Sequence, residues 1–121
     1  MNKAKIISEA KRVLNTELKG IKNLNASFDK NFYNVVKTIY EIKGRVIVTG
    51  IGKSGHIACK IAATLASTGS PAQYVHPAEA SHGDLGMITN QDVVLMLSNS
   101  GENAELSDLI AYTRRFNIHL I

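Results

Sequence analysis

Two serine-bearing turns combine residue types that suit the binding of a phosphate. The first spans residues 50–56, Gly-Ile-Gly-Lys-Ser-Gly-His, and the second spans residues 98–102, Ser-Asn-Ser-Gly-Glu. Glycines let the backbone approach an anion, Lys53 supplies a positive charge, and serine hydroxyls can donate hydrogen bonds. Each turn follows an apolar run and opens a helical pattern, so helix N–H groups would also face the ligand. The two turns predict one phosphorylated small molecule held from two sides.

The first turn has rival interpretations as a nucleotide site. Gly50, Gly52 and Gly55 match the spacing of the dinucleotide fingerprint, but that fingerprint needs an acidic side chain at the end of the next strand, and residues 73–76 are Gln-Tyr-Val-His. A P-loop would need glycine at the position of Ile47. The lysine and serine inside the turn favour a phosphate monoester over NAD or a nucleoside triphosphate.

The second turn has a simpler alternative, because serine followed by glutamate is common at the start of a helix. Alone, residues 98–102 would favour such a cap. Taken together with the Lys53-Ser54 turn, they favour phosphate binding.

The elements that must position these turns follow from the apolar pattern. Short apolar runs predict four strands, which are residues 45–49, 71–75, 92–97 and 118–121. Helical spacing predicts helices over 57–66 and 103–116, with a loop over 76–90. Strands that alternate with helices indicate an α/β fold with a parallel sheet. Ligands of such sheets bind at the carboxyl ends of the strands, where both turns would lie.

Residues 1–43 form a separate basic leader. Apolar residues at helical spacing predict two amphipathic helices joined around residues 20–27. The leader holds nine Lys and Arg against four Asp and Glu, whereas residues 44–121 hold five against six. No RNA-binding aromatic pattern accompanies this charge, so we expect no nucleic-acid partner. We expect the helices to pack on the sheet, with dimer contacts through their apolar stripes as the alternative.

Composition narrows the class of protein further. A chain of 121 residues that is 45% hydrophobic suits one globular domain with a core. The apolar runs are too short for a membrane span, so no membrane association is expected. A single cysteine, Cys59, without an export signal predicts a reducing, cytoplasmic setting.

Several motifs together resemble the sugar isomerase (SIS) domain of bacterial arabinose 5-phosphate isomerases. They are the two turns, Ala-Ser-Thr-Gly at 66–69, Val-His-Pro-Ala-Glu-Ala at 75–80 and His-Gly-Asp-Leu-Gly at 82–86. The similarity runs nearly end to end. It implies a three-layer, flavodoxin-like parallel sheet flanked by helices, preceded by the two N-terminal helices. It also implies interconversion of D-arabinose 5-phosphate and D-ribulose 5-phosphate through an enediol, which feeds synthesis of 3-deoxy-D-manno-octulosonate for lipopolysaccharide or capsule.

The resemblance also implies roles for individual residues. Lys53 and Glu105 fall at catalytic positions, and no cofactor is required, although His76 falls at a position that can take zinc. The positions implied to bind substrate or phosphate are Ser54, Gly69, Ser70, His82, Ser98, Asn99, Ser100, Asn103 and Asp108.

Each of these roles has a structural alternative. Lys53 would otherwise be a solvated counterion of the phosphate, and Glu105 a carboxylate favoured by the helix dipole. His76 and His82 would otherwise order the loop through hydrogen bonds.

Two departures from the family bear on activity. Asn103 stands where related sites have Ser or Thr, which replaces a hydroxyl by an amide. The chain is also expected to stop before the last βα unit, a later Glu and His, and the paired CBS domains. Two hypotheses remain open: an isomerase, assembled as a homo-oligomer, whose missing groups come from elsewhere, and a non-catalytic sugar-phosphate binding module. We expect little isomerase activity from the 121 residues alone.

Overall fold

The computed structural model describes residues 2–121, which form two compact units, one up to Val36 and one over Lys37–Ile121. The first unit holds α1 (Lys3–Asn23), a 3-10 turn η1 (Leu24–Ser27) and the start of α2 (Lys30–Glu41). Asn2 is the N-cap of α1, since its side-chain oxygen accepts a hydrogen bond from the N–H of Ala4 at 3.0 Å. The helix continues through Gly20 and ends at Asn23. The joint between the leader helices therefore spans residues 24–29, whereas the sequence predicted it around residues 20–27.

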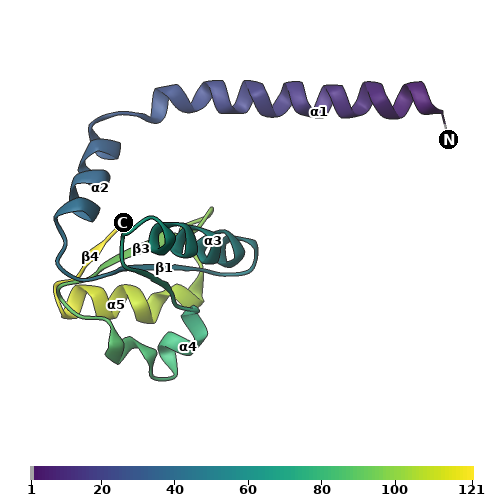
Figure 1. Ribbon diagram of the computed structural model, residues 1–121. Helices are drawn as coiled ribbons and strands as arrows, with labels where there is room; N and C mark the ends of the chain where they lie inside the picture. The colour runs from purple at the N-terminus through teal and green to yellow at the C-terminus, as the bar shows by residue number, and fades with distance from the viewer. Residues whose placement is uncertain (1) are drawn as a thin grey trace. The chain divides into compact units, whose positions relative to one another are not determined.

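The second unit is built on a four-stranded parallel sheet (Figure 1). Its strands are β1 (Val46–Gly50), β2 (Ala72–Tyr74), β3 (Val93–Leu97) and β4 (His119–Leu120), in the order β2-β1-β3-β4. Every residue of β1 is buried, as expected for a central parallel strand that is covered on both faces.

Helices cover both faces of this sheet, which confirms the predicted three-layer α/β fold. On one face, α3 (Lys53–Ser67) and the end of α2 pack over β1 and β3, and the buried residues there are Val46, Val48, Ala58, Ala62 and Val93. On the other face lie α4 (Pro77–Ser81) and α5 (Ser107–Arg115), with the buried residues Ile47, Val75, Ala80, Ile88, Val94, Leu109 and Ile118. Figure 1 shows α3 on one side of the strands and α4 and α5 on the other.

The strand order creates a topological switch point between β1 and β3. The chain leaves β1 to form α3 on one face, and it leaves β3 to form α5 on the other face. In open α/β sheets, ligands bind outside the carboxyl ends of the strands at such a switch point, and 2-1-3-4 is the flavodoxin-like order. The two serine-bearing turns follow the two strands that flank this point.

The segment from 76 to 90 is more ordered than the predicted loop. It contains α4 and a 3-10 turn, η2 (Asp84–Met87). Pro77 occupies the first turn of α4, where its missing N–H costs nothing. The predicted helix over 103–116 likewise divides into a 3-10 turn, η3 (Ala104–Leu106), and α5.

Asp92 holds together the amino end of the sheet. Its side chain is only 2% exposed, and it accepts hydrogen bonds from the N–H of Arg45 at 2.6 Å, the N–H of Thr89 at 2.8 Å and the hydroxyl of Thr89 at 3.0 Å. Burial by itself would raise the pKa of Asp92, but these hydrogen bonds and the Arg45 charge outweigh it and hold the pKa below its ordinary value.

Acid is therefore expected to destabilise the fold through Asp92. The folded state binds this proton less tightly than the unfolded chain does. The contribution is then fully present above the unfolded pKa of about 4 and is lost as the pH falls through the lower folded value. Urea unfolding at a series of pH values from 7 to 2 should show this loss, and the Asp92→Asn variant should show a smaller one. An equal pH dependence in the variant would contradict the assignment.

Candidate functional site

The first turn joins β1 to α3 through only two residues, Ile51 and Gly52. Gly52 has φ of 57°, a backbone conformation that favours glycine. Because Gly52 has no side chain, it cannot cap the first N–H groups of α3, which begin at Lys53 and Ser54. These donors are available to an anion at the carboxyl edge of the sheet.

The start of α3 packs tightly against the ends of two strands. A Cβ at Gly50 would lie 3.0 Å from the carbonyl carbon of Ser54 and 3.1 Å from the carbonyl oxygen of Leu97. Gly50 and Leu97 are also register partners in the sheet. Ser54 of the first turn and Ser98, the residue after Leu97, are therefore brought to the same edge.

Serine hydroxyls form hydrogen bonds inside the second turn and at its junction with Asn103. The N–H of Gly101 donates to the hydroxyl oxygen of Ser98 at 3.0 Å, and the N–H of Glu102 donates to that of Ser100 at 3.3 Å. The Ser100 hydroxyl donates in turn to the side-chain oxygen of Asn103 at 3.4 Å. Among the described residues, the Ser98 hydroxyl donates to no protein group, so its proton can serve an anion without rearrangement.

The remaining polar candidates lie after the second turn, where the chain leaves the carboxyl edge of the sheet through η3 and α5. Asn103 precedes η3, Glu105 lies within it, and Asp108 lies in the first turn of α5. Asn103 is half-buried, whereas Asn99, Glu105 and Asp108 are exposed. Exposed carboxylates at a helix start agree equally with the helix-dipole alternative.

The two histidine candidates flank α4, in the segment that follows β2. His76 is the N-cap of α4, since its Nδ1 accepts a hydrogen bond from the N–H of Ala78 at 3.2 Å. His82 directly follows the last residue of α4. Both are exposed. This cap gives His76 the loop-ordering role that the sequence left open.

Gly69 and Ser70 lie at the opposite edge of the sheet from the two turns. They follow the end of α3 and precede β2, and Gly69 has φ of 95°. The N–H of Ser70 donates to the carbonyl of Leu65 at 2.9 Å, as in a common glycine-dependent helix ending. Their local geometry is explained by this cap, and their implied contact with substrate stays a prediction.

The zinc position implied for His76 would need further ligands beside it. A protein zinc site usually needs three or four ligands. Across residues 2–121, no three His, Cys, Asp or Glu side chains are grouped so that they could hold a metal ion. By themselves, the described residues therefore do not fit a zinc site.

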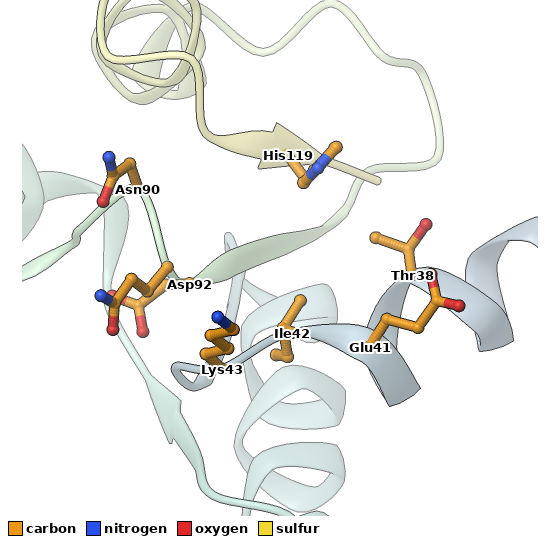
Figure 2. Close-up of a pocket in the computed structure, with 8 residues that line it drawn as sticks. Thr38, Glu41, Ile42, Lys43, Asn90, Asp92 and His119 are labelled. Atoms are coloured by element: carbon orange, nitrogen blue, oxygen red, sulfur yellow. The ribbon is translucent and has the colours of Figure 1, made fainter.

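A cavity of about 330 Å³ opens at the amino ends of β3 and β4 (Figure 2). Its lining residues are Thr38, Glu41, Ile42, Lys43, Asn90, Gln91, Asp92 and His119. None of the predicted site residues is among them. The cavity belongs to the edge of the sheet that faces away from the two turns.

Sequence reasoning missed Tyr74, the last residue of β2. Its hydroxyl donates to the carbonyl oxygen of Gly50 at 3.2 Å, at the start of the first turn. A tyrosine in a strand is usually interpreted as a core residue. Only its position at the end of the strand indicates that its hydroxyl could reach a polar partner.

The fold and the two turns agree with a known family. The SIS domain family matches residues 38–121, and the chain belongs to this family.

Particular relatives are isomerases by name. The chain is 54% identical to the arabinose 5-phosphate isomerase KdsD of Yersinia pestis over 111 residues, covering 92% of this chain and 34% of that protein. It is 51% identical over 115 residues to KdsD of Pseudomonas aeruginosa, covering 95% of this chain and 35% of that protein. The chain thus spans about a third of the length of these relatives.

Solved structures show the same fold. An Escherichia coli CFT073 protein in complex with arabinose 5-phosphate superposes with a TM-score of 0.91 at 42% identity, covering 99% of this chain and 64% of that one. A putative sugar-phosphate isomerase of Listeria monocytogenes superposes with a TM-score of 0.92 at 27% identity, covering 99% of this chain and 63% of that one.

Among the helices of the described residues, none combines the length and the apolar character that a membrane span needs.

Proposed function

We propose that this chain carries the sugar-phosphate site of an arabinose 5-phosphate isomerase, which interconverts D-arabinose 5-phosphate and D-ribulose 5-phosphate. The observation that carries the proposal is the meeting of two phosphate-type turns at the β1–β3 switch point. The names of the KdsD relatives and the arabinose 5-phosphate bound to the E. coli protein support the choice of ligand.

The phosphate is proposed to lie between the two turns. The uncapped start of α3 supplies N–H groups and the Ser54 hydroxyl from one side, and Ser98 and Ser100 supply hydroxyls from the other. A phosphate dianion at a helix start is also favoured by the helix dipole. Lys53 adds a positive charge at the same place.

Isomerisation needs a proton to move between C1 and C2 of the sugar through an enediol. We propose Lys53 and Glu105 for this work, since one is the first residue of α3 and the other lies in η3, which follows the second turn. His82 is proposed to contact the sugar, and Asn99, Asn103 and Asp108 to support binding around the second turn.

A second candidate is a non-catalytic sugar-phosphate binding module. Ser98, Ser100 and Asn103 are held by hydrogen bonds, whereas Lys53 and Glu105 are exposed. The groups that the fold positions are thus the binding groups, which favours this alternative for the 121 residues.

Calorimetry and an isomerase assay separate these possibilities. Arabinose 5-phosphate should bind the chain, whereas arabinose and NADH should not. Formation of ribulose 5-phosphate above the uncatalysed rate would favour the isomerase, and binding without turnover would favour the module. Binding of NADH in place of the sugar phosphate would refute both.

We further propose that the chain forms a homo-oligomer through α1. None of the side chains of this 21-residue helix is buried, and this includes large apolar ones. Between 44% and 63% of the residue surface is exposed at Ile6, Val13, Leu14, Leu18 and Ile21. A continuous apolar stripe of this kind favours a partner surface. The family resemblance, which implies assembly of several chains, favours a second copy.

Introducing charge into the stripe tests this proposal. Leu14→Glu with Leu18→Glu is expected to convert an oligomer into monomers in sedimentation experiments, because carboxylates would have to be buried at the interface. The matched control is Asn15→Glu with Lys19→Glu, which has the same spacing on the polar face and should leave the oligomer intact. A monomeric wild-type chain, or an oligomer that survives the first pair, would contradict it.

A further inference from the structure

Tyr74 connects the end of β2 to the turn that follows β1. Its hydroxyl donates to the carbonyl oxygen of Gly50 at 3.2 Å, and its ring packs on the sheet face that α3 covers. A Cβ at Gly55 would lie 2.8 Å from the Gly50 carbonyl oxygen and 2.9 Å from the Tyr74 hydroxyl oxygen. The end of β1, the Tyr74 hydroxyl and the first turn of α3 are therefore in direct contact.

The surroundings keep this phenol a hydrogen-bond donor. Burial raises the pKa of Tyr74, and the nearby Cys59 acts in the same direction, so the hydroxyl stays protonated at neutral pH. The His76 ring lies edge-on to the Tyr74 ring, with centroids 6.4 Å apart. Tyr74 thus stands between the first turn and the start of α4.

We propose that Tyr74 is a positioning residue of the sugar-phosphate site, whose hydroxyl fixes the Gly50 carbonyl and through it the start of α3 at Lys53 and Ser54. The identity of the ligand rests on the function proposed above, but the fixing of the turn does not. A turn that is already ordered before binding loses less conformational entropy when the ligand arrives.

Thr49 provides a matched control one residue earlier in β1. Its buried hydroxyl donates to the carbonyl oxygen of Val75 at 2.7 Å. Both bonds tie the end of β1 to the region where β2 ends, at Tyr74 or at Val75 directly after it, but the Thr49 bond does not reach the turn. Thr49→Val therefore removes a comparable structural bond and leaves the contacts of Gly50 in place.

The experiment compares Tyr74→Phe and Thr49→Val in the 121-residue chain. Backbone amide relaxation without ligand should show greater mobility of Gly52, Lys53 and Ser54 in Tyr74→Phe, and wild-type values in Thr49→Val. Calorimetry should show arabinose 5-phosphate binding weakened about three- to tenfold in Tyr74→Phe, the equivalent of one hydrogen bond, and unchanged in Thr49→Val.

Two results would overturn the proposal. One is a turn of unchanged mobility in Tyr74→Phe, and the other is an equal loss of affinity in the two variants. If the wild-type chain binds no sugar phosphate, the proposed function fails, while the amide mobilities still decide whether Tyr74 orders the turn.

Discussion

Replacing Asp92 by alanine is expected to lower the free energy of unfolding by about 3 kcal/mol, because the change removes three hydrogen bonds to a buried carboxylate. The N–H groups of Arg45 and Thr89 both point at this carboxylate, which is 2% exposed. The bond to Arg45 spans 47 residues of sequence, so it joins the start of β1 to the start of β3. Urea unfolding followed by circular dichroism measures the loss.

Asp84→Ala is the control for this prediction. Asp84 is exposed in η2, and its replacement should change stability by less than about 0.5 kcal/mol. Equal losses in the two variants would show that the buried bonds of Asp92 contribute little.

Removing both hydroxyls of the second turn is expected to weaken binding of arabinose 5-phosphate by about 1 to 3 kcal/mol, the value of lost hydrogen bonds to a charged group. Ser98→Ala should cost more than Ser100→Ala. The reason is that the Ser98 proton is uncommitted within the described chain, whereas the Ser100 hydroxyl already donates to Asn103. Calorimetric titration of the single and double variants measures these differences.

Ser67→Ala is the matched control for the serine variants. Ser67 ends α3 at the far edge of the sheet, where its hydroxyl donates to the carbonyl of Thr64 at 2.9 Å. Its replacement should leave the affinity unchanged. An unchanged affinity in the Ser98→Ala, Ser100→Ala double variant would remove the second turn from the site.

The central strands could be predicted from the sequence because their apolar runs are short, rich in β-branched residues and bounded by turn signals. Val46 to Val48 and Val93 to Leu97 are such runs, and because helices cover both faces of the sheet, neither run alternates with polar residues. The sequence also predicted both turns at the carboxyl ends of the strands, whereas the switch point depends on the strand order, which only the structure shows.

Other features depend on contacts that local patterns do not contain. The start of α4 uses histidine as its cap, which is unusual, so the sequence predicted a loop there although Pro77 suits the first turn of a helix. Gly55 was recognised by its spacing, but its need for glycine comes from the approach of Gly50 and Tyr74. The bond from Tyr74 to Gly50 links residues 24 apart, which the strand pattern of β2 alone does not predict.

Amide chemical shifts during a titration with arabinose 5-phosphate report directly on whether the two serine-bearing turns hold one phosphate. The largest changes are expected on residues 52–54 and 98–102 together, and arabinose without phosphate should produce none of comparable size. Changes confined to one turn, or centred on the cavity near Lys43 and His119, would contradict a phosphate held between the ends of β1 and β3.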